Sequence, residues 1–134
     1  MSKKIVCLIM SLVIIISLCS FSDDSSGNSL RYNYTNNCFS ELYISGTNGE
    51  CISYLLGYSG ITTKIAVKQY LQVRDGNRWR TSQSWSKTYY SYHASFVNDR
   101  TLYSGNTYRV YSEFTVYSGS NSENVYAYST TYTV

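Results

Sequence analysis

The sequence contains one histidine, His93, and eight acidic residues that are spread along the chain. A zinc site needs clustered His, Cys, Asp or Glu, and the sequence shows no such cluster, so we expect no metal ion and no cofactor. A serine hydrolase would need His93 beside an acid such as Asp99 or Asp75, but no nucleophile-elbow motif accompanies them. No pair of carboxylates is marked out for glycoside hydrolysis either. We therefore expect no catalytic residues and no enzyme activity.

Tyrosine is unusually abundant, with 16 in 134 residues. A small domain cannot bury all of them, so several must lie on outer faces. Tyr70 falls on the polar face of one predicted strand, and Tyr111 and Tyr117 fall on the polar face of a second strand that we expect to be its neighbour. With Lys68 and Arg109 beside them, these rings would suit a sugar ring, peptidoglycan or a protein. These five residues are the candidate ligand-binding site; alternatively, the tyrosines only stabilise a solvated sheet through cross-strand pairs.

The elements that would position these residues are short β-strands. Segments 63–73 and 108–117 alternate apolar and polar residues with a period of two, which is typical of half-buried strands. Weaker patterns add five more strands, giving 40–45, 50–57, 63–73, 79–88, 90–101, 108–117 and 125–134. In the last of these, either the tyrosines or Val125 and Ala127 could face inward. Turn signals rich in Gly, Ser and Asn separate the strands, so the sequence predicts an all-β antiparallel sandwich of about seven strands.

A local signature refines this expectation. Leu102, Gly105, Tyr108 and Val110 form the pattern Leu-x-x-Gly-x-x-Tyr-x-Val at the start of the penultimate strand. The pattern resembles the tyrosine corner of immunoglobulin-like and fibronectin type III domains. The resemblance implies a Greek-key, immunoglobulin-like sandwich in which Tyr108 is buried and its hydroxyl bonds to backbone upstream.

The strand over 79–88 contains both tryptophans. Trp79 and Trp85 have the same parity, which predicts that both face the core. Alternatively, one stands at a sheet edge as a stacking platform, with the rings about 20 Å apart. The segment Asp75-Gly76-Asn77 before this strand could offer oxygens to calcium, but Asp-Gly is common hairpin chemistry, so we expect a plain turn.

Cys38 and Cys51 are the two cysteines outside the N-terminal region, and in an oxidising compartment they favour a disulfide. Such a bridge would add roughly 3 kcal/mol of stability in the chain-entropy model. A tight turn at 46–49 would not place the two residues opposite each other, so the bridge requires the segment before Ser40 to fold back. Two thiols without a bridge are the alternative.

The N-terminal residues have the pattern of a secretory signal peptide. Two lysines precede a nearly unbroken apolar run of 14 residues from Ile5 to Leu18, which is shorter than the ~20 needed to span a bilayer. Small side chains at Ser20 and Ser22 favour cleavage after residue 22; cleavage after Cys19, lipidation of Cys19 and an uncleaved anchor are the alternatives. The polar segment 23–29 predicts a flexible leader, and 30–134 the single sandwich domain.

These boundaries predict a secreted protein with no stable membrane anchor after processing. Removal of Lys3 and Lys4 leaves nine basic and eight acidic residues, so no charge excess points to nucleic acid. The order of short motifs along the chain resembles a group of small secreted proteins from Gram-positive Firmicutes. These motifs are Arg31-Tyr32-Asn33-Tyr34-Thr35, Gly57-Tyr58-Ser59-Gly60-Ile61-Thr62-Thr63-Lys64-Ile65, Tyr70-Leu71-Gln72, Trp79, Trp85, Tyr108-Arg109-Val110 and Val116-Tyr117-Ser118-Gly119-Ser120. The resemblance implies secretion and a β-sandwich and assigns no functional residue.

Two functions are compatible with this sequence. The first is a non-catalytic secreted module that binds a cell-wall glycan or an extracellular protein through exposed tyrosines. The second is a membrane-active toxin or antimicrobial-type protein, which the alternating Tyr-, Ser- and Thr-rich strands suggest. The last segment, 125–134, lacks the outward apolar band that a pore would need, so we favour the binding module.

Overall fold

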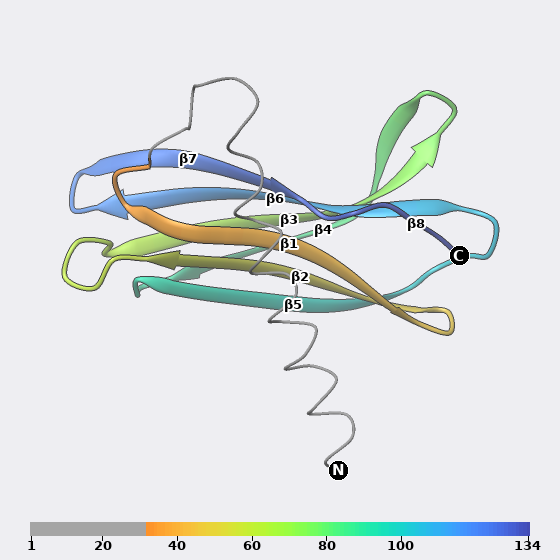
Figure 1. The fold of residues 1–134 in the computed structure, drawn as a ribbon, viewed down its shortest axis with the longest axis horizontal. Coiled ribbons are helices and arrows are strands. Elements are labelled where there is room, and N and C mark those ends of the chain that lie inside the picture. The colour runs from red at the N-terminus through yellow and green to blue at the C-terminus, as the bar shows by residue number, and fades with distance from the viewer. Residues whose placement is uncertain (1–31) are drawn as a thin grey trace, which may run out of the picture. The chain divides into compact units, whose positions relative to one another are not determined.

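The computed structural model describes residues 32–134, which form eight β-strands and no helix (Figure 1). The strands are β1 (Thr35–Ser45), β2 (Asn48–Gly57), β3 (Lys64–Asp75), β4 (Arg78–Tyr89), β5 (His93–Thr101), β6 (Thr107–Ser118), β7 (Asn121–Tyr128) and β8 (Tyr132–Thr133). The predicted signal peptide and leader lie outside the described residues. Within 32–134 there is no helix that could span a membrane.

The strands form two antiparallel sheets. One sheet has the order β1-β2-β5, and the other has the order β4-β3-β6-β7 with β8 paired to the start of β6. The chain turns back within a sheet at the β1–β2, β3–β4 and β6–β7 hairpins, and it changes sheet in the connections between them. This order confirms the predicted immunoglobulin-like antiparallel sandwich, with the two strands over 63–73 and 108–117 as neighbours.

The three hairpins use the same kind of turn. Each has a two-residue loop whose first residue is glycine, namely Gly46, Gly76 and Gly119, all with φ 61°. A positive φ at the first loop position alone is the mark of a type II′ turn, whose twist matches that of the two strands it joins. Asp75-Gly76-Asn77 is therefore part of a hairpin turn between two paired strands.

The last predicted strand is divided into β7 and β8 by the interruption at Ser129. Its backbone N–H donates to the carbonyl of Val110 at 2.8 Å, but its hydroxyl, not its carbonyl, accepts from the Val110 N–H at 2.7 Å. The same hydroxyl donates to the carbonyl of Thr130. Because a serine side chain takes the place of a backbone group in the ladder, the regular pairing stops there.

The first strand begins five residues earlier than the sequence predicts, because a carboxylate holds its entry segment. Glu123 on β7 accepts from the backbone N–H groups of Asn33 at 2.9 Å and Tyr34 at 2.7 Å. The hydroxyl of Thr35 also donates to it, at 3.1 Å. Charge-assisted bonds of this kind are about twice as strong as neutral ones, so Glu123 fixes the start of β1 against β7.

The inward-facing apolar residues form two clusters rather than one. The first comprises Leu42, Cys51, Leu71, Val73, Leu102, Tyr108 and Val110. The second comprises Leu55, Ile65, Val67, Ala94, Phe114, Val116 and Val125. On β2, β3 and β6 alike, one buried polar residue separates the members of the two clusters, so the boundary is a layer that crosses both sheets.

This polar layer consists of Ser40, Ser53, Gln69 and Ser112, all buried. Ser40 pairs with Ser53 in one sheet, and Gln69 pairs with Ser112 in the other. The two pairs meet between the sheets, where the Ser112 hydroxyl bonds to both Ser40 and Ser53, the latter at 2.6 Å. Gln69 Nε2 donates to Ser53 Oγ at 2.8 Å, and no buried side-chain N or O among residues 32–134 lacks a partner. The layer is therefore satisfied internally, as burial of polar groups requires.

The predicted disulfide between Cys38 and Cys51 is wrong. In the β1–β2 ladder Cys38 lies opposite Leu55, whereas Cys51 lies opposite Leu42. The two cysteines are thus offset by four residues along β2, about 13 Å at ~3.3 Å per residue. A disulfide needs Cα atoms within about 7 Å, and β1 continues as a strand paired with β2, with one irregularity between Thr35 and Asn37, instead of folding back before Ser40.

Candidate ligand-binding face

The candidate site lies on the outer face of the five-stranded sheet. Because side chains alternate along a strand, this face carries the even-numbered residues of β3 and β7 and the odd-numbered residues of β6. Pairing aligns them in rows that cross the three strands. The successive rows are Lys64–Tyr117–Ser122, Ala66–Thr115–Asn124, Lys68–Glu113–Tyr126 and Tyr70–Tyr111–Tyr128, and Gln72–Arg109 follow on β3 and β6.

Four tyrosines form a stacked group on this face, which we call the tyrosine cluster: Tyr70, Tyr111, Tyr126 and Tyr128. The Tyr111 ring stacks on Tyr128 with centroids 4.6 Å apart, on Tyr70 at 5.6 Å and on Tyr126 at 6.3 Å. Tyr70 and Tyr111 are half-buried, whereas Tyr126 and Tyr128 are 52% and 56% exposed. The two accessible rings are thus held by a partly covered third ring at the centre.

Arg109 extends the cluster toward β4. Its guanidinium lies 4.3 Å from the Trp79 ring centroid and 4.6 Å from that of Tyr128, so it is sandwiched between the two. Its Nε donates to Gln72 Oε1 at 2.7 Å, which fixes the plane of the group. Cation–π contacts contribute about 0.5–1 kcal/mol each at exposed sites, so Arg109 orders both rings.

A β-bulge places Trp79 on this outer face. Leu71 pairs with Gln83 and the next residue, Gln72, pairs with Thr81, so β4 has one residue too many at this point. The extra residue reverses the parity of β4, and the shared face predicted for Trp79 and Trp85 is therefore wrong. Trp85 packs against the first core cluster, whereas Trp79 lies over Arg109. The hairpin beyond the bulge curves away from β6 at the upper right of Figure 1.

Glu113 connects the cluster to the row below it. The Tyr111 hydroxyl donates to Glu113 Oε1 at 3.0 Å. Burial, with this hydrogen bond and the Glu113 charge in addition, raises the pKa of Tyr111 well above its ordinary value. Tyr111 therefore stays protonated, and able to donate to the carboxylate, to a higher pH than an exposed tyrosine would.

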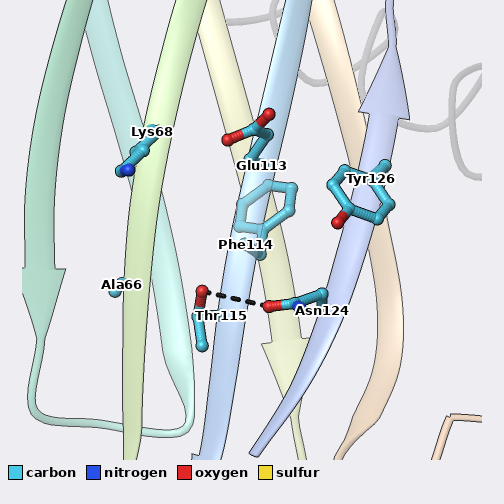
Figure 2. Close-up of a pocket in the computed structure, with 7 residues that line it drawn as sticks. All are labelled: Ala66, Lys68, Glu113, Phe114, Thr115, Asn124 and Tyr126. Atoms are coloured by element: carbon cyan, nitrogen blue, oxygen red, sulfur yellow. Dashed lines mark hydrogen bonds between the residues drawn. The ribbon is translucent and has the colours of Figure 1, made fainter.

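Below the tyrosine cluster the face is hollowed (Figure 2). The depression has a volume of about 240 Å³ and is lined by Ala66, Lys68, Glu113, Phe114, Thr115, Asn124 and Tyr126. It exists because the row Ala66–Thr115–Asn124 has small side chains, while the adjacent rows carry tyrosines and lysines. The Thr115 hydroxyl donates to Asn124 Oδ1 at 3.3 Å, which holds the Asn124 amide across the floor.

Of the five residues proposed from the sequence, four lie together. Tyr70, Lys68, Tyr111 and Arg109 occupy consecutive rows of this face, whereas Tyr117 is three rows from Tyr111 and contacts Lys64, whose Nζ is 4.1 Å from its ring centroid. The sequence analysis missed the exposed members Tyr126 and Tyr128, because it left the orientation of their strand open. The buried Val125 decides it, since alternation along β7 then places the even-numbered residues Tyr126 and Tyr128 on the outer face.

The residues of the tyrosine-corner pattern lie at the entry to β6. Tyr108 is buried, and its hydroxyl accepts from the backbone N–H of Tyr103 at 3.0 Å. Leu102 is buried beside it in the first core cluster, and Gly105 has φ 88°, a left-handed conformation that favours glycine. These three residues hold the β5–β6 connection and lie away from the tyrosine cluster.

The residues considered for catalysis and metal binding lie elsewhere. His93 begins β5 and contacts the Tyr54 ring edge-on, with centroids 5.3 Å apart. Asp99 is six residues further along the same strand, about 20 Å away. Asp75 belongs to the β3–β4 turn. In the part of the chain that the structure describes, no three His, Cys, Asp or Glu side chains are grouped as metal ligands would be.

Comparison with known proteins identifies no family for this chain. No family model matches the sequence, and no curated protein matches it. Among solved structures, the solution structure of R. palustris CsgH is similar, with 11% sequence identity and a TM-score of 0.42 over 69% of this chain and 88% of that one. A similarity of this size identifies no relative whose function could be transferred, so the functional assignment depends on the outer face itself.

Proposed function

We propose that this protein is a secreted, non-catalytic β-sandwich module that binds a cell-surface glycan or an extracellular protein. The observation that carries the proposal is the exposure of Tyr126 and Tyr128 on a face where Tyr111 and Arg109 hold them. The N-terminal sequence pattern and the resemblance to small secreted Firmicutes proteins support secretion.

Ordered exposed rings are suited to binding for an energetic reason. Immobilising a mobile side chain on binding costs about 0.5–1.5 kcal/mol, and that cost is lower for a ring already held in place. Tyrosine offers a large apolar area together with a hydroxyl group, the combination that recurs in binding surfaces. All members of the tyrosine cluster lie on paired strands rather than loops, which keeps their spacing fixed.

The test is retention of the purified protein on Gram-positive cells and on isolated cell walls. We expect Tyr126→Ser/Tyr128→Ser to reduce the retained fraction about tenfold or more, the range reached when aromatic contacts at the centre of an interface are truncated. The matched control is Tyr43→Ser/Tyr103→Ser, because these tyrosines are 54% and 71% exposed and lie on other strands or loops. Equal loss in both double variants would show that the outer face has no special role.

Two further measurements complete this test. Unchanged far-UV circular dichroism and thermal unfolding would show that the variants remain folded, since all four substituted rings are more than 40% exposed. Leakage of dye from liposomes at the same protein concentration would contradict the proposal and favour the membrane-active alternative. Retention without leakage is the expected result.

A further inference from the structure

The depression on the outer face has the composition of a small polar subsite beside an aromatic wall. Tyr126 forms the wall on β7, and in Figure 2 its hydroxyl points toward β6. Lys68 and Glu113 form the side nearest the tyrosine cluster, while Thr115 and Asn124 form the floor. An exposed ring next to hydrogen-bonding groups matches a ligand that has one apolar face and several hydroxyl groups.

The hydrogen-bonding groups of the depression are only partly used by the protein. Glu113 accepts from Tyr111 through Oε1, and Asn124 accepts from Thr115 through Oδ1. Among residues 32–134, the structure records no hydrogen bond to Glu113 Oε2, from the Asn124 amide nitrogen or from the Lys68 ammonium group. The Glu113 acceptor and the Asn124 and Lys68 donors are thus available to a ligand, and they lie in two adjacent rows of the face.

The charge and size of the depression restrict the ligand further. Lys68 and Glu113 are direct cross-strand partners, so their opposite charges offset each other and an anionic ligand gains little. The volume of about 240 Å³ is below the ~300–1,000 Å³ of pockets that enclose drug-sized ligands, so a single ring fits. Because these residues lie on paired strands, the distance from the ring of Tyr126 to the polar groups is fixed.

We propose that the depression lined by Tyr126, Asn124, Glu113 and Lys68 is a subsite for one uncharged pyranose ring of a glycan. The C–H face of the sugar stacks on the exposed Tyr126 ring. Its hydroxyl groups donate to Glu113 Oε2 and accept from the Asn124 amide and the Lys68 ammonium group. The assignment rests on the proposed function, which it deepens by naming the ligand class and the part of the face that recognises it.

The test is a titration of the full chain, ¹⁵N-labelled, with two soluble probes, chitotetraose and cellotetraose. We expect at least one probe to shift the backbone amides of Thr115, Asn124 and Tyr126. We expect Tyr126→Ala to raise the dissociation constant about tenfold or more. The matched control is Tyr43→Ala, a ring of similar exposure on β1, which should leave the dissociation constant unchanged.

A second variant tests the depression independently of the aromatic ring. Ala66 lies on its floor, opposite Thr115 and on the solvent side of β3. Ala66→Leu fills the space without touching the core, so it should abolish the shifts while the protein stays folded. Sugar binding that survives both Tyr126→Ala and Ala66→Leu would overturn the assignment of this subsite.

Retention on cell walls separates this inference from the proposed function. Sacculi that have been boiled in detergent and treated with protease present glycan but little protein. Retention on them, competed by the oligosaccharide that shifts the amides, supports a sugar ligand. Retention on untreated cells that Tyr126→Ser/Tyr128→Ser abolishes, without retention on sacculi and without shifts by either probe, overturns the sugar subsite but leaves the binding module in place. Absence of retention on every surface overturns both.

Discussion

Gln69 is the residue on which the buried polar layer depends most. Its Nε2 lies within hydrogen-bonding distance of the Cys51 carbonyl at 3.1 Å, the Ser53 hydroxyl at 2.8 Å and the Phe96 carbonyl at 3.1 Å. Its Oε1 accepts from Asn98 Nδ2 at 2.9 Å. The side chain is fully buried and joins β3 to β2 and β5 of the opposite sheet. Replacing it by leucine, which has a similar size, removes all of these bonds and keeps the space filled.

The expected loss of stability follows from the partners left behind. Asn98 loses the acceptor of its amide, and Ser53 loses one of its two bonds while keeping the one to Ser112. A buried polar group without a partner costs about 1–3 kcal/mol; the half-buried Asn98 falls toward the lower end of this range, and the weakened contacts of the carbonyls add to it. The extra apolar burial of leucine offsets part of the loss, so we expect Gln69→Leu to lower the free energy of unfolding by about 2–3 kcal/mol. For a domain of this size that corresponds to a decrease in Tm of roughly 10–20 °C.

Urea unfolding followed by tryptophan fluorescence measures this change in the free energy of unfolding. The slope m of the same curve shows whether the denatured state also changes. The matched control is Gln83→Leu on β4, a half-buried glutamine whose recorded hydrogen bond is a long one of 3.5 Å to a neighbouring carbonyl. It should change stability by less than about 0.5 kcal/mol. If Gln69→Leu were as stable as the parent protein, the polar layer would not contribute in the way its hydrogen bonds indicate.

Further predictions concern the cysteines, the entry to β1 and the cation beside the tyrosine cluster. Alkylation of the denatured, unreduced protein should label both Cys38 and Cys51, which lie in one tryptic peptide; mass spectrometry of that peptide counts the labels. Burial raises the pKa of Cys51 to about 12, so between about pH 9 and pH 12 the folded protein keeps a thiol proton that the unfolded chain releases. The free energy of unfolding should therefore fall as pH rises through this range, by at most ~1.4 kcal/mol per pH unit for this group. The fall should be less steep in Cys51→Ala. Glu123→Gln should speed hydrogen exchange at least tenfold at the two amides that bind its carboxylate. Arg109→Met should lower stability by about 1–2 kcal/mol and shift the indole N–H resonance of Trp79.

The Glu123 and Arg109 substitutions each have a control on another part of the sandwich. Glu50→Gln replaces a half-buried carboxylate on β2 and should leave exchange at the start of β1 unchanged. Arg100→Met removes an exposed arginine on β5 and should move neither tryptophan resonance. A tryptic peptide without labels before reduction would contradict the β1–β2 register, since bridging the two cysteines needs a shift of about four residues.

The sequence predicts the fold well because its two central strands are strongly periodic and its turns carry glycine. The pattern over 63–73 and 108–117 gives two central strands whose pairing brings Tyr70 beside Tyr111. The bulge in β4 could not be predicted, because one extra residue in a polar strand leaves no mark in the alternation of Ser, Thr and Arg. That single residue places Trp79 on the outer face of the five-stranded sheet while Trp85 faces the core. The cysteines mislead for a related reason, since their presence indicates chemistry but only strand register decides whether two sulfurs can meet.

The register between β3 and β6 also has a signal in the sequence, which an analysis of period-two alternation does not use. The apolar face of β3 is interrupted at Gln69 and that of β6 at Ser112. Burying two such polar side chains on neighbouring strands costs the least free energy when they lie opposite each other, because each then has a polar neighbour in place of an apolar one. The structure pairs these two residues directly, and the same pairing aligns Tyr70 with Tyr111 in the next row of the outer face. The buried polar layer and the tyrosine cluster are therefore set by one register, so a slip that exposed the first would also disperse the second.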